Sequence, residues 1–136
     1  MSDLYDVAEK SNITIYNFKM KKAKAISIPG KIGIDESKMK NNSELNVCLA
    51  HELGHQFKNA FYDISSTFET RERQEARATR WAINELVPVD ELLEAFKAGY
   101  TEVYDLAEYF NVTEDFIRNA FYIYEVNGTF ENIKNN

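Results

Sequence analysis

The first part of the chain consists of short stretches in which apolar and polar positions nearly alternate. Apolar residues at helical spacing predict a brief helix over Asp3–Lys10. β-Branched and aromatic residues then predict strands over Ile13–Phe18, Lys24–Ile28 and Lys31–Ile34, and Pro29-Gly30 predicts the turn that joins the last two. Since these strands are short and follow closely on one another, we expect a small antiparallel or mixed three-stranded sheet.

The remainder of the chain has the spacing of helices. A polar cluster at residues 41–43 predicts the N-cap of a helix that runs from Leu45 to about Phe57. After a loop over residues 61–67, a charged helix is predicted from Phe68 to Val87, because Pro88 cannot continue it. Shorter helices are predicted over Asp90–Lys97, Glu102–Phe110 and Thr113–Val126, and the polar end with Asn132, Asn135 and Asn136 is expected to fray.

These patterns predict an α+β fold that is mainly helical. A length of 136 residues fits a single domain over 1–136. Within it we expect an N-terminal helix and small sheet over 1–40, two long helices over 41–88, and a C-terminal helical subregion over 89–130.

Composition and charge restrict the class of partner. The net charge of −6 argues against a broad basic surface for nucleic acid and is compatible with a basic protein partner. The chain has one cysteine, Cys48, and no apolar run long enough for a signal peptide or a membrane span. We therefore expect a cytoplasmic protein with no membrane partner.

Both histidines of the chain lie in one pentapeptide, His51-Glu52-Leu53-Gly54-His55. Positions i and i+4 of a helix share a face, so the two imidazoles can hold one metal ion. Glu52 lies on the flank, from which its carboxylate can act as general base on a metal-bound water. The spacing predicts a zinc hydrolase, and Mn²⁺ or Fe²⁺ also suits such ligands.

A third metal ligand must be a carboxylate or Cys48, because no further histidine exists. Glu69, Glu72 and Glu75 lie at a suitable distance along the chain, on the following helix. We favour Glu75, because Ala78 and Ala82 continue its stripe and allow the two helices to approach closely. The alternatives are that Glu75 is an exposed helix charge and that Cys48 is a small buried apolar residue.

The oxyanion of a cleaved amide requires a donor opposite the metal, and Tyr or Arg can serve. Tyr62, which follows the histidine helix, is our candidate; the competing interpretation is that it packs with Phe61 under the loop. Gly54 is expected to let a neighbouring element pass close to the helix.

The chain resembles the ImmA/IrrE family of bacterial zinc metallopeptidases. The resemblance rests on His51–His55, on the segment Glu75-Ala-Arg-Ala-Thr-Arg-Trp81-Ala82, and on Leu86-Val-Pro88. It implies a zincin-like fold in which His51, His55 and Glu75 bind zinc and Glu52 is catalytic. Trp81, Glu85 and Val87 depart from the usual residues of the family, and none of them is a ligand.

The resemblance also implies a substrate. Family members typically act as anti-repressors that remove a small helix-turn-helix repressor, often one encoded beside them on a phage or mobile element. An edge strand of the small sheet would then bind the substrate by β-augmentation, and our candidate edge is Lys31, Ile32, Gly33 and Ile34.

The segment Asp105–Arg118 itself resembles a helix-turn-helix, which gives the C-terminal subregion the form of a helical cap. Its second helix carries Glu114 and Asp115, and these carboxylates would repel DNA phosphates, so direct DNA binding is not expected. An alternative to the peptidase is a non-catalytic module that sequesters a DNA-binding partner and uses zinc only for structure. A toxin paired with an antitoxin is a third hypothesis.

Overall fold

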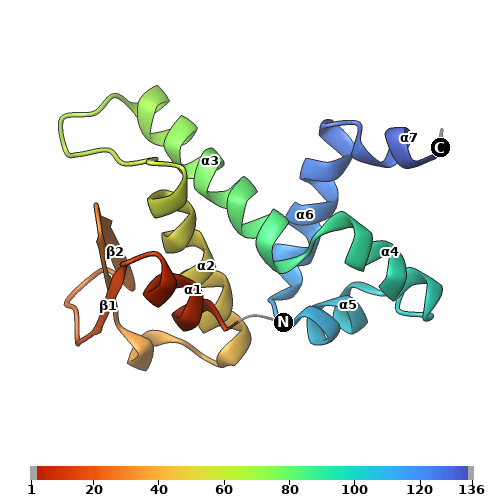
Figure 1. Ribbon diagram of the computed structural model, residues 1–136, viewed down its shortest axis with the longest axis horizontal. Helices are drawn as coiled ribbons and strands as arrows, with labels where there is room; N and C mark the ends of the chain where they lie inside the picture. The colour runs from red at the N-terminus through yellow and green to blue at the C-terminus, as the bar shows by residue number, and fades with distance from the viewer. Residues whose placement is uncertain (1–2, 135–136) are drawn as a thin grey trace. The chain divides into compact units, whose positions relative to one another are not determined.

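The chain divides into two compact units, Met1–Ala82 and Ile83–Asn136, and the boundary lies inside one long helix. The structure is a computed structural model that describes residues 3–134. It is α+β and mainly helical, with a small mixed sheet, as the sequence predicts (Figure 1). The single domain over 1–136 stays a prediction. Among the described helices, none has the length and apolar character needed to cross a membrane.

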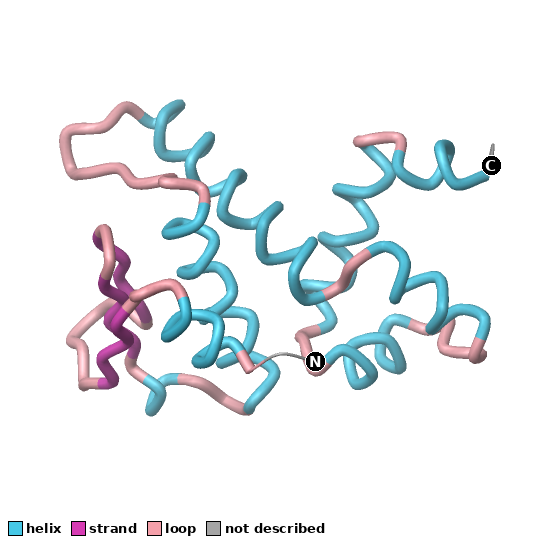
Figure 2. The backbone as a smooth tube through the Cα atoms, in the orientation of Figure 1, coloured by secondary structure: helices cyan, strands magenta, loops and turns pink. Residues whose placement is uncertain are grey.

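The first unit contains the sheet and the helices that cover it (Figure 2). Its elements in chain order are α1 (Leu4–Lys10), β1 (Thr14–Asn17), β2 (Ala25–Ile28), β3 (Lys31–Ile34), a 3₁₀ turn (Glu36–Lys38), α2 (Asn42–Phe57) and most of α3 (Phe68–Leu86). α1 contacts β1, and α2 contacts β2 and β3, so both helices pack on one face of the sheet.

The strand order of the sheet is β1-β3-β2. β3 runs parallel to β1 and antiparallel to β2, so it is the central strand. The prediction that Lys31–Ile34 forms an edge strand is therefore wrong. The apolar run of β3 reflects this central place, since Ile32 and Ile34 are fully buried, and the edges of the sheet are β1 and β2.

α2 is positioned by its cap and by its contact with α3. The Asn41 side chain accepts a hydrogen bond from the backbone N–H of Glu44 at 2.9 Å, which satisfies the first turn. At Gly54 the backbone of α3 passes so close that an added Cβ would collide with the carbonyl group of Ala78. This confirms the expected close approach at Gly54. One turn further, the rings of Phe57 and Trp81 stack with centroids 5.0 Å apart.

The second unit is wholly helical. It contains the end of α3, then α4 (Val89–Lys97), α5 (Val103–Phe110), α6 (Glu114–Val126) and α7 (Thr129–Lys134). The helices α5 and α6 meet in the predicted helix-turn-helix manner: Asn111 adopts the left-handed region with φ 55°, and Thr113 caps α6 by accepting from the N–H of Phe116.

The C-terminal end differs from the prediction. Asn132, which was expected to fray, lies in α7, and Gly128 with φ 71° forms the turn that separates this helix from α6. Asn135 and Asn136 lie outside the described residues.

Candidate metal centre

The two histidines project from one face of α2, and their ring centroids lie 4.9 Å apart. The Nδ1 atom of each ring has a hydrogen-bond partner. His55 Nδ1 lies 2.6 Å from the carbonyl oxygen of Ala60, and His51 Nδ1 lies 3.3 Å from Thr79 Oγ1. When each Nδ1–H donates to its oxygen, as in a metal-bound histidine, Nε2 of each ring has the lone pair that a metal ligand needs; without a metal, Nε2 of His51 can instead donate to Glu75.

Glu75 on α3 faces both Nε2 atoms. Its Oε2 lies 2.6 Å from His51 Nε2, and its Oε1 lies 3.5 Å from His55 Nε2. One possible ligand atom from each of these three residues lies within 4.8 Å of the ligand atoms of the other two. The structure therefore brings together the three residues that the sequence proposes as ligands.

The other candidates for the third ligand lie elsewhere. Cys48 is not part of this group, and burial raises the pKa of its thiol to about 11, so the thiol stays protonated at neutral pH. Glu69 and Glu72 are exposed on α3.

The electrostatics of the three residues suit a cation. Burial lowers the pKa of the His51 imidazole, which favours the neutral ring that metals bind, although the hydrogen bond to Glu75 acts against it. Burial acts to raise the pKa of the Glu75 carboxyl, but hydrogen bonds with Tyr62 and His51 outweigh it and leave that pKa below its ordinary value. Two neutral nitrogens and one carboxylate oxygen are a usual donor set for catalytic zinc, and they also suit Mn²⁺ or Fe²⁺.

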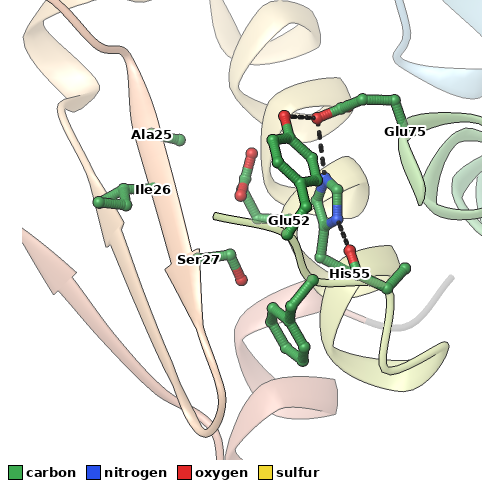
Figure 3. A pocket seen from close by; sticks show the side chains of 9 residues that line it. Ala25, Ile26, Ser27, Glu52, His55 and Glu75 are labelled. Atoms are coloured by element: carbon green, nitrogen blue, oxygen red, sulfur yellow. Dashed lines mark hydrogen bonds and ion pairs between the residues drawn. The ribbon is translucent and has the colours of Figure 1, made fainter. Parts of the chain in front are cut away.

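Glu52 lies beside this group, at a pocket of about 220 Å³. Burial raises the pKa of the Glu52 carboxyl; His55 opposes this effect and the negative charge of Glu75 adds to it. The pocket is lined by one strand, two helices and the loop between them, through Ala25, Ile26, Ser27, Glu52, His55, Ala60, Phe61, Tyr62 and Glu75. Figure 3 shows Glu52, His55 and Glu75 on one side of the pocket and strand β2 on the other.

Tyr62 reaches the site from the loop that joins α2 to α3. Its hydroxyl donates to Glu75 Oε1 at 2.6 Å, and this bond raises the pKa of the phenol to about 12. Arg71 lies over the Tyr62 ring at 6.0 Å and donates to the carbonyl oxygen of Ile64, so it holds the loop against α3. The structure thus places Tyr62 at the pocket; its role as oxyanion donor stays a prediction.

The predicted substrate strand does not line this pocket. Because β3 is central, the strand beside Glu52 is the edge strand β2, which contributes Ala25 and Ser27. The sequence-based prediction of the edge was wrong because the order of the strands in the sheet, β1-β3-β2, differs from their order in the chain.

Three supporting groups were also missed: the Ala60 carbonyl, Thr79 and Gln56. Thr79 lies one turn after Glu75, and this spacing on α3 could have indicated a partner for a histidine. Gln56 follows His55 and fixes the β2–β3 turn, donating to Ser27 Oγ at 2.6 Å and to the Ile28 carbonyl at 2.7 Å, and accepting from Gly30 N–H at 2.9 Å.

Comparison with known proteins agrees with this geometry. No curated protein and no solved structure matches the chain. The M78 peptidase family, described as the IrrE N-terminal-like domain, matches residues 8–122. This range covers most of both units and includes the four site residues His51, Glu52, His55 and Glu75. That family is one of zinc metallopeptidases, and His51, His55 and Glu75 are placed to bind a metal. The chain belongs to the IrrE N-terminal-like family of M78 peptidases.

Proposed function

We propose that this protein is a zinc-dependent endopeptidase that inactivates a helix-turn-helix repressor by cleaving it. The observation that carries the proposal is the convergence of His51, His55 and Glu75 beside the buried carboxyl of Glu52. When bound to these three residues, zinc would act as a Lewis acid and would lower the pKa of water.

Glu52 is the proton carrier of the proposed reaction. Its raised pKa makes its carboxylate a stronger base than an exposed glutamate, so it can take the proton from the attacking water. The same carboxyl can then give that proton to the nitrogen of the leaving amine. Tyr62, whose hydroxyl already points at the metal ligand Glu75, is the proposed donor to the developing oxyanion.

The edge of β2 is the proposed binding strand for the substrate. The carbonyl of Lys24 accepts from the N–H of Asp35 on the β3 side. Bonding directions alternate along an antiparallel strand, so Ile26 also turns its backbone groups toward β3, while Ala25 and Ser27 turn theirs to the open edge. An extended peptide paired there would run past Glu52.

Membership of the family supports a repressor as substrate, and such a repressor is found with the DNA in the cytoplasm. Direct DNA binding by this chain is not part of the proposal. The basic residue of the helix-turn-helix-like segment, Arg118, is paired with Glu114 at 3.2 Å and Asp115 at 3.0 Å, so α6 offers phosphates no uncompensated cation at this position.

The test uses a purified helix-turn-helix repressor from the same genome as the candidate substrate. The purified full chain, loaded with zinc, is expected to cleave it at a defined bond, which mass spectrometry of the fragments identifies. Glu52→Gln is expected to keep the fold and one equivalent of zinc while the rate falls by about a thousandfold or more, because the carboxylate that moves the proton is gone.

The matched control is Glu91→Gln, an exposed glutamate at the start of α4 that should leave the rate unchanged. If Glu52→Gln still removed the repressor from its operator without cleavage, the peptidase proposal would fail. The alternative of a sequestering module with structural zinc would then hold.

A further inference from the structure

The face of the sheet turned away from α2 is apolar and exposed. Tyr16 and Phe18 from the β1 side and Ile26 and Ile28 from β2 are each about half exposed, at 48, 52, 54 and 53%. They line a groove of about 180 Å³ together with Lys31, Ile32 and Gly33. We call these seven residues the outer sheet face.

Gly33 is the floor of this groove. A Cβ at this position would lie 2.9 Å from the Phe18 ring, 3.0 Å from the Ile26 side chain and 3.1 Å from the end of Met20. The apolar side chains of both neighbouring strands thus close over the central strand, and they leave a continuous apolar surface of a kind that soluble proteins use for binding.

The segment that carries the outer sheet face has a charge opposite to that of the whole chain. Residues 14–34 contain five lysines and no acidic residue, although the chain as a whole carries −6. Lys24 pairs with Glu44 at 2.9 Å. Within the described residues, none of the other four (Lys19, Lys21, Lys22 and Lys31) is within 4.0 Å of a carboxylate, and all four are exposed.

The outer sheet face adjoins the metal pocket across strand β2. Ile26 lines both the groove and the pocket. Figure 3 shows Ala25 and Ser27 turned toward Glu52 and His55, and Ile26 turned away from them. A peptide strand added at the edge of β2 would therefore place alternate side chains in the metal pocket and beside Ile26 and Ile28.

We propose that the outer sheet face selects the substrate: the segment bound along β2 carries apolar side chains that cover Ile26 and Ile28 and acidic side chains that meet Lys31 and the lysines of residues 19–22. This inference rests on the proposed peptidase function. It adds the chemical class of the segment, which is extended, apolar and acidic.

A peptide fits this surface better than the other polyanions that lysines attract. The open backbone groups of Ala25 and Ser27 are satisfied by another peptide backbone, which neither a lipid headgroup nor a nucleic acid supplies. The acidic remainder of the chain also repels a large polyanion such as DNA or an anionic membrane.

The experiment measures binding of short fluorescent peptides to the zinc-loaded full chain carrying Glu52→Gln, so that nothing is cleaved. The first peptide has serine at every second position and carries leucine and glutamate by turns at the positions between, so that both kinds of side chain lie on the outer sheet face. In the second peptide lysine replaces the glutamates, and in the third serine replaces the leucines. We expect the first to bind at least roughly tenfold more tightly than either of the others, with an affinity that falls as salt rises.

Two pairs of variants locate the site of binding. Lys31→Glu should weaken the leucine–glutamate peptide by roughly three- to tenfold, and Lys97→Glu, an exposed lysine of α4, should not. Ile28→Thr should weaken it by roughly threefold or more, whereas Val126→Thr, at an exposed apolar residue of α6, should not. All four positions are on the surface, so the fold should survive.

Equal affinity for the three peptides, or equal effects of the variants and their controls, would overturn the inference. The inference would also be overturned if Lys31→Glu abolished binding to vesicles of phosphatidylserine or to single-stranded DNA but did not abolish binding to the peptide. Self-association of the chain that Ile28→Thr abolishes, with no peptide bound, would assign the face to a second copy instead. If the wild type cleaved the repressor but the chain showed no preference for the acidic peptide, this inference alone would fail. If the chain bound that peptide selectively but cleaved nothing, the peptidase proposal alone would fail.

Discussion

Each histidine of the site is fixed at the ring nitrogen that does not face Glu75. His55 is buried and bound to the carbonyl of Ala60, which belongs to the backbone, so no substitution of a side chain removes that contact. His51 is only partly buried, and its partner is the side chain of Thr79. The orientation of His51 therefore depends on one hydroxyl, which makes it the more easily disturbed ligand.

Thr79→Val tests this dependence, since it keeps the shape of the side chain and removes the hydroxyl. Without the partner at Nδ1, the ring of His51 can rotate and its tautomer is no longer fixed. We expect zinc affinity, measured by competition with a chromophoric chelator, to fall by roughly tenfold. Thr101→Val, at an exposed position before α5, is the control and should leave the affinity unchanged; equal affinities for both variants would show that Thr79 does not orient the ring.

Asp35 is a buried carboxylate of the unit Met1–Ala82 that lies outside the metal site. It is 2% exposed and accepts from Met20 N–H at 2.9 Å, from Ser37 N–H at 3.1 Å and from Ser37 Oγ at 2.5 Å. The hydrogen bonds from Ser37 and Met20 hold the pKa of this carboxyl below its ordinary value. They tie the β1–β2 connection to the end of β3.

A lowered pKa in the folded state gives stability that is present above the unfolded pKa and lost as the pH falls through the folded one. Asp35→Asn places an NH₂ group opposite one of these N–H donors, so it should lower the free energy of unfolding at neutral pH. Urea unfolding across a pH series is expected to show the wild type and the variant converging in acid. Asp6→Asn, at an exposed aspartate of α1, should run parallel to the wild type at every pH; a constant gap for Asp35→Asn would refute the role of its charge.

At the scale of elements, the site is created by the closeness of α2 and α3. The two histidines come from α2 and Glu75 comes from α3, so their ligand atoms meet only if the helix axes are close. Gly54 permits this, because the backbone of Ala78 occupies the space that a Cβ would need. A backbone group cannot rotate away as a side chain can.

Gly54→Ala is therefore expected to move the helices apart. Alanine favours a helix over glycine by about 1 kcal/mol, yet the collision should cost more, about 1–3 kcal/mol, and the net effect is a loss of stability. Zinc affinity should fall with it, since Glu75 moves away from the histidines. Chemical unfolding and zinc competition measure the two effects, and a more stable variant with unchanged affinity would contradict the close contact.

The helices could be predicted from the sequence because their signals are local. The Asn41 cap, the apolar spacing from Leu45, and Pro88 after α3 each act on neighbouring residues. The order of the strands could not, because the pairing of β1 with β3 joins segments that are distant in the chain and leaves no local pattern in either strand. α7 was missed since its polar composition resembles a frayed end.

The same division applies to the site. The spacing of His51 and His55 and the Glu75-Ala78-Ala82 stripe are features of single helices, and the structure brings the three proposed ligands together. The sequence gives little information on which elements face one another in the fold. That arrangement decides whether Tyr62, Thr79 and strand β2 lie at the site. The family and the three proposed ligands followed from the local signals, and the surroundings of the site required the fold.

At the scale of the molecule, the proposed metal ligands all lie in one of the two units. His51, His55 and Glu75 all lie in the unit Met1–Ala82, and within the described residues the unit Ile83–Asn136 contains no such group. A metal that binds only the folded state stabilises what it joins. Zinc should thus protect the first unit directly.

Zinc at a hundred times its dissociation constant is expected to stabilise the wild type by roughly 2.7 kcal/mol and to raise its thermal midpoint; a chelator should reverse this. Glu75→Gln should lose most of the shift, because an amide oxygen is a weaker ligand than a carboxylate, while Glu72→Gln, an exposed neighbour on α3, should keep it. Hydrogen exchange should show the added protection in α2 and in the part of α3 up to Ala82. The ion would have to bind elsewhere if the zinc-dependent protection lay in α5 or α6, because none of the proposed ligands lies in those helices. An equal shift of the thermal midpoint in Glu75→Gln and the wild type would lead to the same conclusion.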